Sequence, residues 1–437
     1  MKKLFPKQDE ALQFFLKCQR EGRNTLDTSH VGTGKTVVAC HLAHSSSLRN
    51  VAVICPKAVI PSWEREMRES GLNPLFVLNY EKIRTGRTKW MSKRGKKIMT
   101  WELPKDTLVL VDEVHKCKSP YTQNAQMLIS LVSQGYRVHA MSATAAEDPT
   151  EMRSLGYMLG LHSLNRTVGV LRSWYSWMQK NGCKKDFWNQ WQLSDRSKLR
   201  PLRHKMYGTN VKKLTIHDFP DSFKENRVFV EPIQFDDHNK IIQAYDDLGI
   251  TPEIIEQYIE HGTVEDSEYV LVNILRARQL AESFKVKDFA DMARELEREG
   301  NNVVLFVNFR ETALALCEAL KCKAIIGGQS AEERQQAIDE FQADESSMLV
   351  VNIAAGGTGL SLHDINGKCP RVSLISPTFN VKDHLQALGR IHRNGAKSDA
   401  LQKILVASGS IEEAVMKAIG NKTKNLQELH DEEPAEA

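Results

Sequence analysis

The stretch Ser29-His30-Val31-Gly32-Thr33-Gly34-Lys35-Thr36 decides how the rest of the chain is interpreted. Its end, Gly-x-Gly-Lys-Thr, is typical of a phosphate-binding loop, in which glycines let backbone N–H groups approach phosphates and the following helix points its N-terminus at the anion. In that pattern the Lys35 ammonium reaches the β- and γ-phosphates, and the Thr36 hydroxyl binds Mg²⁺. We therefore predict nucleotide contacts from Gly32, Thr33, Gly34, Lys35 and Thr36.

Two features of this stretch depart from the general pattern. The pattern has glycine where this chain has Ser29, and the strand expected before the loop is weakly marked at residues 24–26. The helix expected after the loop is well marked at residues 37–43. A glycine-containing surface loop is the alternative interpretation of the stretch taken by itself.

The composition is that of a soluble globular protein. The 437 residues are 41% hydrophobic and 26% charged with a net charge of +4, so a nucleic-acid partner must be inferred from local basic patches. The eight cysteines are scattered without zinc-site spacing, which indicates reduced packing residues. No apolar run approaches the ~18 residues of a membrane span, and the first residues lack the apolar core of a signal peptide. We expect a cytoplasmic protein with no membrane partner.

Short apolar runs alternate with helical stretches in two parts of the chain, which predicts two α/β lobes with parallel sheets. Buried strands are predicted at residues 51–55, 75–78, 107–111 and 138–141, then at 303–307, 324–326, 348–351, 372–375 and 403–406. Helices are predicted at residues 62–70, 123–132, 254–259, 270–280, 311–320, 331–341 and 381–391. We predict a first lobe at residues 1–160, a basic and helical middle with the inter-lobe linker at 161–284, a second lobe at 285–425 and an acidic disordered tail at 426–437.

Asp112-Glu113-Val114-His115 directly follows the predicted strand at residues 107–111. Carboxylates at the carboxyl edge of a parallel sheet lie where ligands bind in such folds. Asp112 is placed to hold Mg²⁺ through water, and Glu113 to orient or deprotonate an attacking water. An acidic strand end without function is the alternative, which the phosphate-binding loop upstream makes less favoured.

These motifs, with Ser142-Ala143-Thr144, resemble motifs I, II and III of superfamily-2 helicases and translocases. Asn308–Arg310 resembles motif IV, Asn352–Leu362 motif V and Gln386–Arg393 motif VI. More narrowly, Ile54–Glu66 is similar to motif Ia of the Swi/Snf family, the ATP-driven duplex-DNA translocases. The resemblance covers residues 4–425 and implies two RecA-like lobes in tandem, with helical insertions between them and ATP in the cleft.

The chain departs from that family at two places. Ala143-Thr144-Ala145 stands where the family commonly has Gly-Thr-Pro, and Ser29-His30 stands where it commonly has an acidic pair. Neither departure removes a group needed for ATP hydrolysis.

The resemblance also implies roles for residues outside the phosphate-binding loop and the Asp112-Glu113 motif. Gln8, in Phe5-Pro6-Lys7-Gln8, would recognise adenine, although an isolated Gln is more often a surface residue. Arg390 and Arg393 lie three apart on the predicted helix at 381–391, and would stabilise the γ-phosphate across the cleft when the lobes close. The run Gly356–Gly359 would contact a DNA phosphate. Gly359 is also predicted to contact the bound nucleotide.

Two basic stretches are candidates for nucleic-acid contacts. Residues 82–97 carry eight Lys or Arg and no acid, and residues 161–220 carry twelve against three Asp. Such charges give sequence-independent, salt-sensitive affinity for a phosphate backbone. Trp174, Trp177, Trp188 and Trp191 interleave with the second stretch, where we favour helix packing over stacking on bases.

The sequence therefore predicts a minimal, monomeric DNA-dependent ATPase, bacterial or viral, with ATP and Mg²⁺ as cofactors. Its predicted catalytic residues are Lys35, Asp112, Glu113, Arg390 and Arg393. Duplex DNA is the favoured track, with forked or single-stranded DNA possible, and DNA repair, replication, recombination or remodelling of protein–DNA complexes is the expected setting. Two alternatives stay open: a strand-separating DNA or RNA helicase, and a nucleotide-gated clamp without productive hydrolysis.

Overall fold

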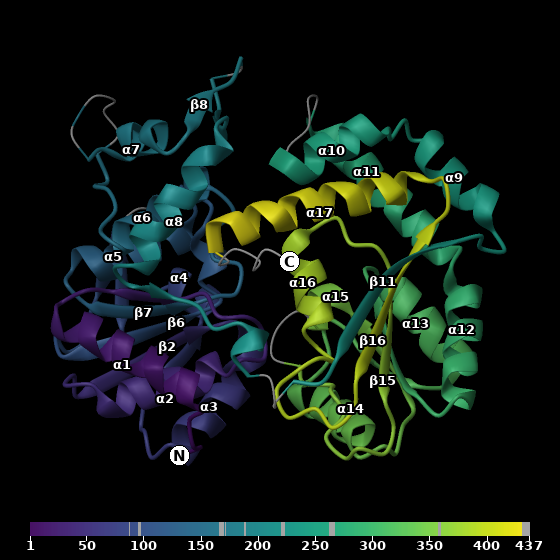
Figure 1. Cartoon of the computed structure of the whole chain (residues 1–437), viewed down its shortest axis with the longest axis horizontal. Coiled ribbons are helices and arrows are strands. Elements are labelled where there is room, and N and C mark those ends of the chain that lie inside the picture. The colour runs from purple at the N-terminus through teal and green to yellow at the C-terminus, as the bar shows by residue number, and fades with distance from the viewer. Residues whose placement is uncertain are drawn as a thin grey trace. The chain divides into compact units, whose positions relative to one another are not determined.

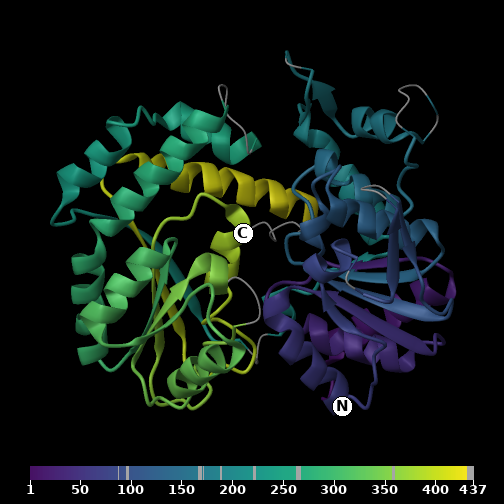
Figure 2. The same cartoon turned by 180° about the vertical axis from the view of Figure 1, so that it is seen from behind.

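The computed structural model divides the chain into two compact units, Met1–Asp218 with Lys424–Ala437, and Phe219–Thr423. It describes residues 1–86, 88–94, 98–165, 170, 172–187, 189–219, 223–261, 267–356 and 360–430. Each unit is built on its own six-stranded sheet with helices on both faces (Figures 1 and 2). The predicted fold class, two tandem lobes with parallel sheets, is confirmed. The four-part division at residues 160, 284 and 425 stays a prediction.

The sheet of the first unit has the strand order β10-β1-β7-β6-β2-β3, and every neighbouring pair is parallel. The strands predicted from apolar runs are present, and the weakly marked strand before the phosphate-binding loop is present as β1. The bounds are β1 Thr25–Asp27, β2 Asn50–Cys55, β3 Val77–Asn79, β6 Thr107–Asp112, β7 Arg137–Met141 and β10 Val211–Lys212.

Helices of the first unit cover the two faces of this sheet (Figure 1). One face carries α1 (Pro6–Arg20), α2 (Lys35–Ser45) and α3 (Ile60–Glu69). The other carries α4 (Tyr80–Arg84), α5 (Gln123–Ser133), α6 (Arg153–Met158) and α8 (Leu199–Tyr207).

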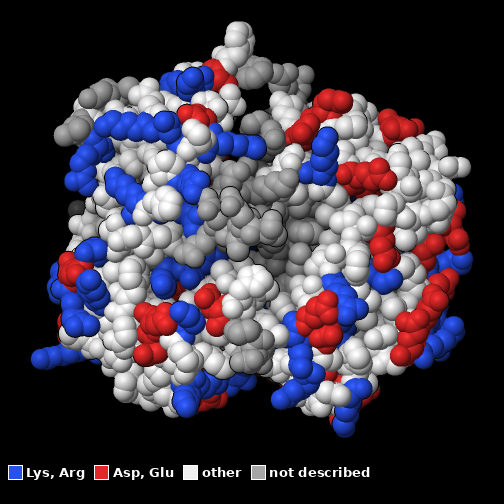
Figure 3. All heavy atoms as spheres, viewed as in Figure 1, with Lys and Arg blue, Asp and Glu red and all other residues white. Residues whose placement is uncertain are grey.

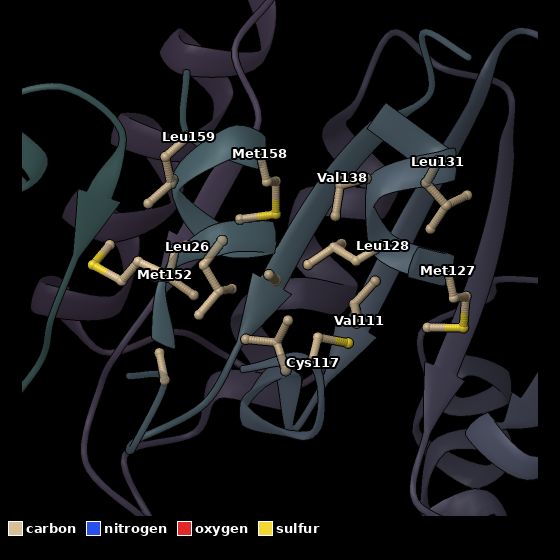
Figure 4. Close-up of a cluster of buried hydrophobic side chains, with 14 of the residues drawn as sticks. Leu26, Val111, Cys117, Met127, Leu128, Leu131, Val138, Met152, Met158 and Leu159 are labelled. Atoms are coloured by element: carbon tan, nitrogen blue, oxygen red, sulfur yellow. The ribbon is translucent and has the colours of Figure 1, made fainter. Parts of the chain in front are cut away.

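Apolar side chains of the strands and helices meet on this second face (Figure 4). Leu26, Val111 and Val138 point from three strands toward Leu128 of α5 and Met158 of α6, and all five are at most 3% exposed. Burying each side chain of this size contributes about 1.5–3 kcal/mol, so this cluster stabilises the sheet edge that carries the site.

The first unit also contains two antiparallel hairpins and one further helix. The hairpins are β4 (Met91–Arg94) with β5 (Ile98–Trp101), and β8 (Cys183–Lys185) with β9 (Trp191–Leu193). Helix α7 (Trp174–Lys180) precedes the second hairpin. The two basic stretches of the sequence lie on and beside these hairpins.

The second unit contains a parallel sheet with the strand order β11-β16-β15-β12-β14-β13. All strands predicted here are present: β12 Asn302–Val307, β13 Lys323–Ile325, β14 Met348–Asn352, β15 Arg371–Ile375 and β16 Ala400–Ala407. The edge strand β11 (Asn226–Ile233) was not predicted. Val228, Phe229 and Val230 of β11 are 40–49% exposed, so this strand lacks the burial of the others.

Helices also cover both faces of the second sheet (Figure 1). Those packed on it are α12 (Val286–Arg298), α13 (Arg310–Leu320), α14 (Ala331–Gln342), α15 (Ile353–Gly356) and α16 (Val381–Leu388). The others are α9 (His238–Asp246), α10 (Pro252–His261), α11 (Ser267–Ser283) and α17 (Ile411–His430). No helix within the described residues has a stretch long and apolar enough to cross a membrane.

Two helix ends differ from the predictions. The helix predicted at residues 381–391 ends at Leu388, with Gly389 as its C-cap, because the Arg390 carbonyl instead accepts the backbone N–H of Leu362 at 3.0 Å. Arg390 and Arg393 therefore do not share a helix face. Helix α17 continues to His430, so residues 426–430 of the predicted disordered tail are helical, consistent with the strong helix formers Leu426, Gln427 and Glu428. Residues 431–437 lie outside the described residues.

Candidate functional site

The phosphate-binding loop joins β1 to α2, which is the strand–loop–helix context that the motif requires. Gly32 and Gly34 have φ angles of 86° and 89°, in the left-handed region that favours glycine. A side chain at Gly34 would also collide with the Gln8 amide. Gly34 is the N-cap of α2, and Lys35 and Thr36 form its first turn. The loop interpretation is thereby favoured over an ordinary surface loop.

The Lys35 ammonium folds back over its own loop. Nζ of Lys35 donates to the carbonyl oxygens of Ser29, at 2.6 Å, and His30, at 2.9 Å. The buried Asp27 carboxylate lies close by and accepts the Ser29 N–H at 2.9 Å; burial raises the pKa of Asp27, and the Lys35 charge opposes that rise. Because bonds from an ammonium to phosphate oxygens are stronger than bonds to neutral carbonyls, a bound phosphate would compete for Lys35.

Gln8 is buried against the loop rather than exposed on the surface, with 4% of its area accessible. Its Oε1 accepts the backbone N–H of Phe5 at 3.0 Å, and its Nε2 donates to the Thr33 carbonyl at 2.8 Å. The amide thus ties the start of α1 to the phosphate-binding loop. Adenine recognition by Gln8 stays a prediction and requires the amide to exchange at least one of these bonds.

The carboxylate of Asp112 is held at the carboxyl end of β6. Its Oδ1 accepts the Glu113 N–H at 2.9 Å, and its Oδ2 accepts the indole Nε1–H of Trp63 at 2.8 Å. The Tyr80 hydroxyl donates to the Asp112 backbone carbonyl at 2.6 Å. Burial, and next the Glu113 charge, raise the pKa of Asp112 to about 7, while Trp63 and Lys35 oppose the rise. The structure therefore brings Asp112 and Lys35 within electrostatic reach of each other at one edge of the sheet.

Trp63 is a residue of this site that the sequence interpretation missed. It is 1% exposed and lies on α3, within the segment Ile54–Glu66 that resembles motif Ia. The motif resemblance indicated the family, but the indole contact depends on how α3 packs against β6.

Glu113 links the ends of β6 and β7. Its Oε2 lies 3.1 Å from Nδ1 of His115 and accepts a bond from the Ser142 hydroxyl at 3.4 Å, and Ser142 in turn lies 2.9 Å from Nδ1 of His115. Glu113 has a φ angle of 54°, a left-handed conformation that costs a residue with a Cβ about 1–2 kcal/mol. Such strain persists where surrounding contacts fix it and is common at functional sites.

Thr36 and Asp112, the predicted magnesium ligands, supply hard oxygen donors of the kind that Mg²⁺ prefers. Thr36 is half-buried in the first turn of α2, and Asp112 is held at the end of β6. Within the described residues no group of three or more His, Cys, Asp or Glu could hold a metal by itself. A site of one hydroxyl and one carboxylate, completed by substrate phosphates and water, is the sparse arrangement in which Mg²⁺ is usually bound. The residues present therefore fit Mg²⁺.

Arg390 and Arg393 lie in the second unit and form hydrogen bonds between motif VI and motif V. Arg390 is 3% exposed and donates from Nη1 to the Leu360 carbonyl at 3.3 Å. Arg393 donates from Nη1 to the Ser361 hydroxyl at 2.8 Å, and burial lowers its pKa to about 10. Gly359, with Gly357 and Thr358, lies outside the described residues. Contact of these groups with a nucleotide stays a prediction.

A basic surface covers part of the first unit, where Lys and Arg side chains gather over α6, α7 and α8 (Figure 3). The exposed basic residues described within residues 161–220 are Arg172, Lys180, Lys184, Lys185, Arg196, Lys198, Arg200 and Lys205. Trp174 and Trp177 are at most 5% exposed, stack on each other at 5.7 Å and contact His162, so helix packing is confirmed for this pair. Trp188 lies outside the described residues.

Comparison with known proteins places these motifs in a family. Residues 285–395, which include Asn308 and Arg393, match the family model of the helicase conserved C-terminal domain. The chain is 29% identical over 456 residues to L364 of Acanthamoeba polyphaga mimivirus, which is named as an ATP-dependent RNA helicase; the match covers 98% of this chain and 84% of L364. It is 22% identical to the SNF2 domain-containing protein ENL1 of Oryza sativa subsp. japonica, with 95% of this chain and 50% of ENL1 covered.

These similarities support a Swi/Snf-type ATPase of superfamily 2. A solved structure of the Sulfolobus solfataricus SWI2/SNF2 ATPase core in complex with dsDNA overlaps 99% of this chain and 98% of its own, with 16% identity and a TM-score of 0.39. Because this TM-score is low, the fold is assigned from the two parallel sheets described above and not from this likeness. The similarity to this family supports ATP-driven activity that depends on nucleic acid.

Proposed function

We propose that this Swi/Snf-type ATPase is stimulated by DNA and translocates along duplex DNA. The observation that carries the proposal is the placement of Lys35, Asp112 and Glu113 at one edge of the first sheet, with the phosphate-binding loop entering α2 beside them. Parallel α/β sheets bind ligands at this edge. The similarity to the Swi/Snf family supports the choice of duplex DNA as the track.

In the proposed reaction, Lys35 and the N–H groups of the loop bind the β- and γ-phosphates of ATP. Thr36 and Asp112 hold Mg²⁺, which when bound neutralises part of the phosphate charge. Glu113 accepts the proton of the attacking water, and Arg390 and Arg393 stabilise the charge that develops on the γ-phosphoryl group. Since the arginines belong to the second unit, turnover requires the two units to close on the nucleotide.

The basic surface supports a nucleic-acid track because exposed Lys and Arg side chains gather along one segment of the first unit (Figure 3). The acids within it, Asp186 and Asp195, bind backbone N–H groups of their own turns. Contacts between exposed Lys or Arg and phosphates give affinity that falls steeply with salt and does not depend on sequence.

The test is the rate of ATP hydrolysis in low salt with no nucleic acid, blunt duplex DNA, single-stranded DNA and RNA. We expect duplex DNA to stimulate the rate most and salt to remove the stimulation. The variant Glu113→Gln should retain ATP binding while turnover falls by about 10²- to 10⁴-fold, the range for loss of a general base. A rate that no nucleic acid changes would contradict the proposal.

A strand-separating helicase is the second candidate, and one relative favours it: L364 is named as an ATP-dependent RNA helicase. Unwinding of a tailed duplex without displacement of a third strand from a triplex would assign strand separation instead of duplex translocation. RNA as the best activator would assign the RNA track. Full biological activity in Glu113→Gln would instead assign a nucleotide-gated clamp.

A further inference from the structure

Helix α11 of the second unit supplies a buried carboxylate to the start of α13. Glu282 is 4% exposed. Its Oε1 accepts the backbone N–H of Phe309 at 3.0 Å, and its Oε2 accepts that of Asn308 at 2.9 Å. Phe309 is the N-cap of α13 and has no side-chain oxygen to accept N–H groups at this end. A carboxylate is favourable here because the helix dipole is positive at its N-terminus. Glu282 therefore fixes where the segment that resembles motif IV begins.

The Asn308 residue joins three segments of the second unit. Its Nδ2 donates to Oε2 of Glu282 at 2.7 Å and to the Pro377 carbonyl at 3.0 Å. Its Oδ1 accepts a bond from Nη2 of Arg278, which lies one turn before Glu282 on α11, at 3.3 Å. Its backbone carbonyl accepts Nδ2 of Asn352 at 2.9 Å. Glu282 thus acts on Asn352 and Pro377 through one residue.

The segments that contain Asn352 and Pro377 both lead to α16. Oδ1 of Asn352 accepts the Ala355 N–H at 3.1 Å within α15, and α15 packs against α16. After Pro377, the Phe379 ring centroid lies 4.2 Å from the Arg278 guanidinium carbon, and Asn380 is the N-cap of α16. The contacts that start at α11 therefore fix both the helix beside α16 and the first residue of α16.

The two arginines of motif VI directly follow the end of α16. The Arg390 backbone N–H donates to the Ala387 carbonyl at 3.1 Å. Nε of Arg393 donates to the carbonyl of Gly389, the C-cap of α16, at 3.1 Å. Where α16 lies therefore decides where both guanidinium groups start from.

We propose that Glu282 is a positioning residue for Arg390 and Arg393, which it places through Asn308 and α16. The proposal rests on the role of these arginines in the proposed function. It adds a residue of α11, outside the motifs, on which that role depends. Loss of the Glu282 carboxylate should slow the chemical step and leave ATP binding unchanged, because the phosphate-binding loop belongs to the first unit.

The test is steady-state ATP hydrolysis by the full chain, with and without saturating duplex DNA. Glu282→Gln replaces one acceptor oxygen with a donor that faces the N–H groups of Asn308. We expect kcat and kcat/KM to fall together by about 10²-fold, the effect that a small misplacement can have on an interaction made in the transition state. The affinity for a fluorescent ATP analogue should not change.

Two further variants accompany Glu282→Gln. Arg278→Lys keeps the charge but loses the planar contact with Phe379, so it should also lower kcat and kcat/KM together. Glu311→Gln is the matched control, because Glu311 is exposed and accepts a bond from Gln279 of α11 at 3.5 Å. This control should leave both constants unchanged.

A combined variant tests the route from Glu282 to the arginines. In a chain that already carries Arg390→Ala and Arg393→Ala, adding Glu282→Gln should cause little further loss of kcat. Losses that multiply would overturn the proposal, because Glu282 would then act by another route. A lower urea midpoint of Glu282→Gln by far-UV circular dichroism, with normal kcat in the folded protein, would also overturn it and leave Glu282 a structural role alone.

The arginine variant also separates this proposal from the proposed function. Normal kcat in Arg390→Ala with Arg393→Ala would overturn the role of the arginines, and this proposal with it. Reduced kcat there, with normal kcat in Glu282→Gln, would overturn this proposal alone. Because each comparison is also made without nucleic acid, it does not depend on whether duplex DNA stimulates hydrolysis.

Discussion

The indole Nε1–H of Trp63 donates to Oδ2 of Asp112 at 2.8 Å. The other carboxylate oxygen of Asp112 accepts the Glu113 N–H at 2.9 Å, so hydrogen bonds to both oxygens fix the orientation of this half-buried carboxylate. A carboxylate held in this way keeps its orientation when a metal ion arrives, and partners outside the metal's own ligands commonly tune its affinity. Trp63 therefore acts on Asp112 as a positioning residue.

Trp63→Phe removes this donor and keeps most of the ring volume. We predict that the Mg²⁺ concentration for half-maximal ATP hydrolysis rises by about 10- to 100-fold, with a smaller change in kcat at saturating Mg²⁺. The measurement is a Mg²⁺ titration of the ATPase rate. Trp177→Phe is the matched control, because Trp177 is also buried and its indole nitrogen has no hydrogen-bond partner among the described residues. An unchanged Mg²⁺ requirement in Trp63→Phe would contradict this role.

Gly34→Ala should weaken ATP binding. The substitution places a Cβ in a left-handed conformation, which costs about 1–2 kcal/mol, and drives it into the Gln8 amide. Gly71→Ala carries the same conformational cost at a φ angle of 69° with nothing within 4 Å of the added Cβ, so it should bind ATP normally. Titration with a fluorescent ATP analogue separates the two variants, and equal affinities would show that the loop tolerates a side chain.

Glu151 should make the first unit less stable as the pH rises. Burial raises the pKa of Glu151 from 4.5 to about 7, with Lys118 opposing the rise. The folded state therefore binds a proton between these values that the unfolded state has released, so this stabilisation is complete below about pH 4.5 and is lost as the pH rises through 7.

The variant Glu151→Gln isolates this contribution because its side chain stays neutral. Urea unfolding followed by tryptophan fluorescence reports the first unit, where all seven tryptophans lie. Between pH 4.5 and 7, the free energy of unfolding of the unaltered chain should fall more steeply than that of the variant. Glu10→Gln, at an exposed ion pair with Lys7, is the control. Parallel pH profiles for Glu151→Gln and the unaltered chain would be inconsistent with a raised pKa.

Lys285→Met should destabilise the second unit by about 3–5 kcal/mol, because it leaves the Glu412 carboxylate buried without its cation. The two side chains are 1% and 4% exposed, and Glu412 also accepts the Ala407 N–H at 2.9 Å. Far-UV circular dichroism should show an unfolding transition of the variant at a lower urea concentration. Tryptophan fluorescence, which reports the first unit, should not show this change. Lys287→Met, at a neighbouring pair that is exposed, should leave the transition in place, and an equal effect of both variants would argue against the buried pair.

The central strands could be predicted because they are buried on both faces and read as continuous apolar runs. The edge strand β11 could not, since Arg227, Glu231 and Pro232 interrupt its apolar residues, and an edge position tolerates all three. The ends of helices were less predictable. Helix α16 stops before Arg390 because the Arg390 carbonyl accepts the backbone N–H of Leu362. The spacing of apolar residues in the sequence does not indicate this bond.

The site residues that belong to one motif at the end of one strand, such as Lys35 and Asp112, could be predicted. Contacts made where two elements meet could not be predicted. The Trp63 indole reaches Asp112 only because α3 packs beside β6, and the Ser142 hydroxyl reaches Glu113 because β7 pairs with β6.

Displacement of a third strand from a blunt-ended triplex tests the proposed duplex translocation most directly. The unaltered chain should release the third strand when ATP and Mg²⁺ are present. The Glu113→Gln variant should release none, and neither should the unaltered chain without Mg²⁺. Stimulation of ATP hydrolysis by the same duplex without release of the third strand would contradict duplex translocation.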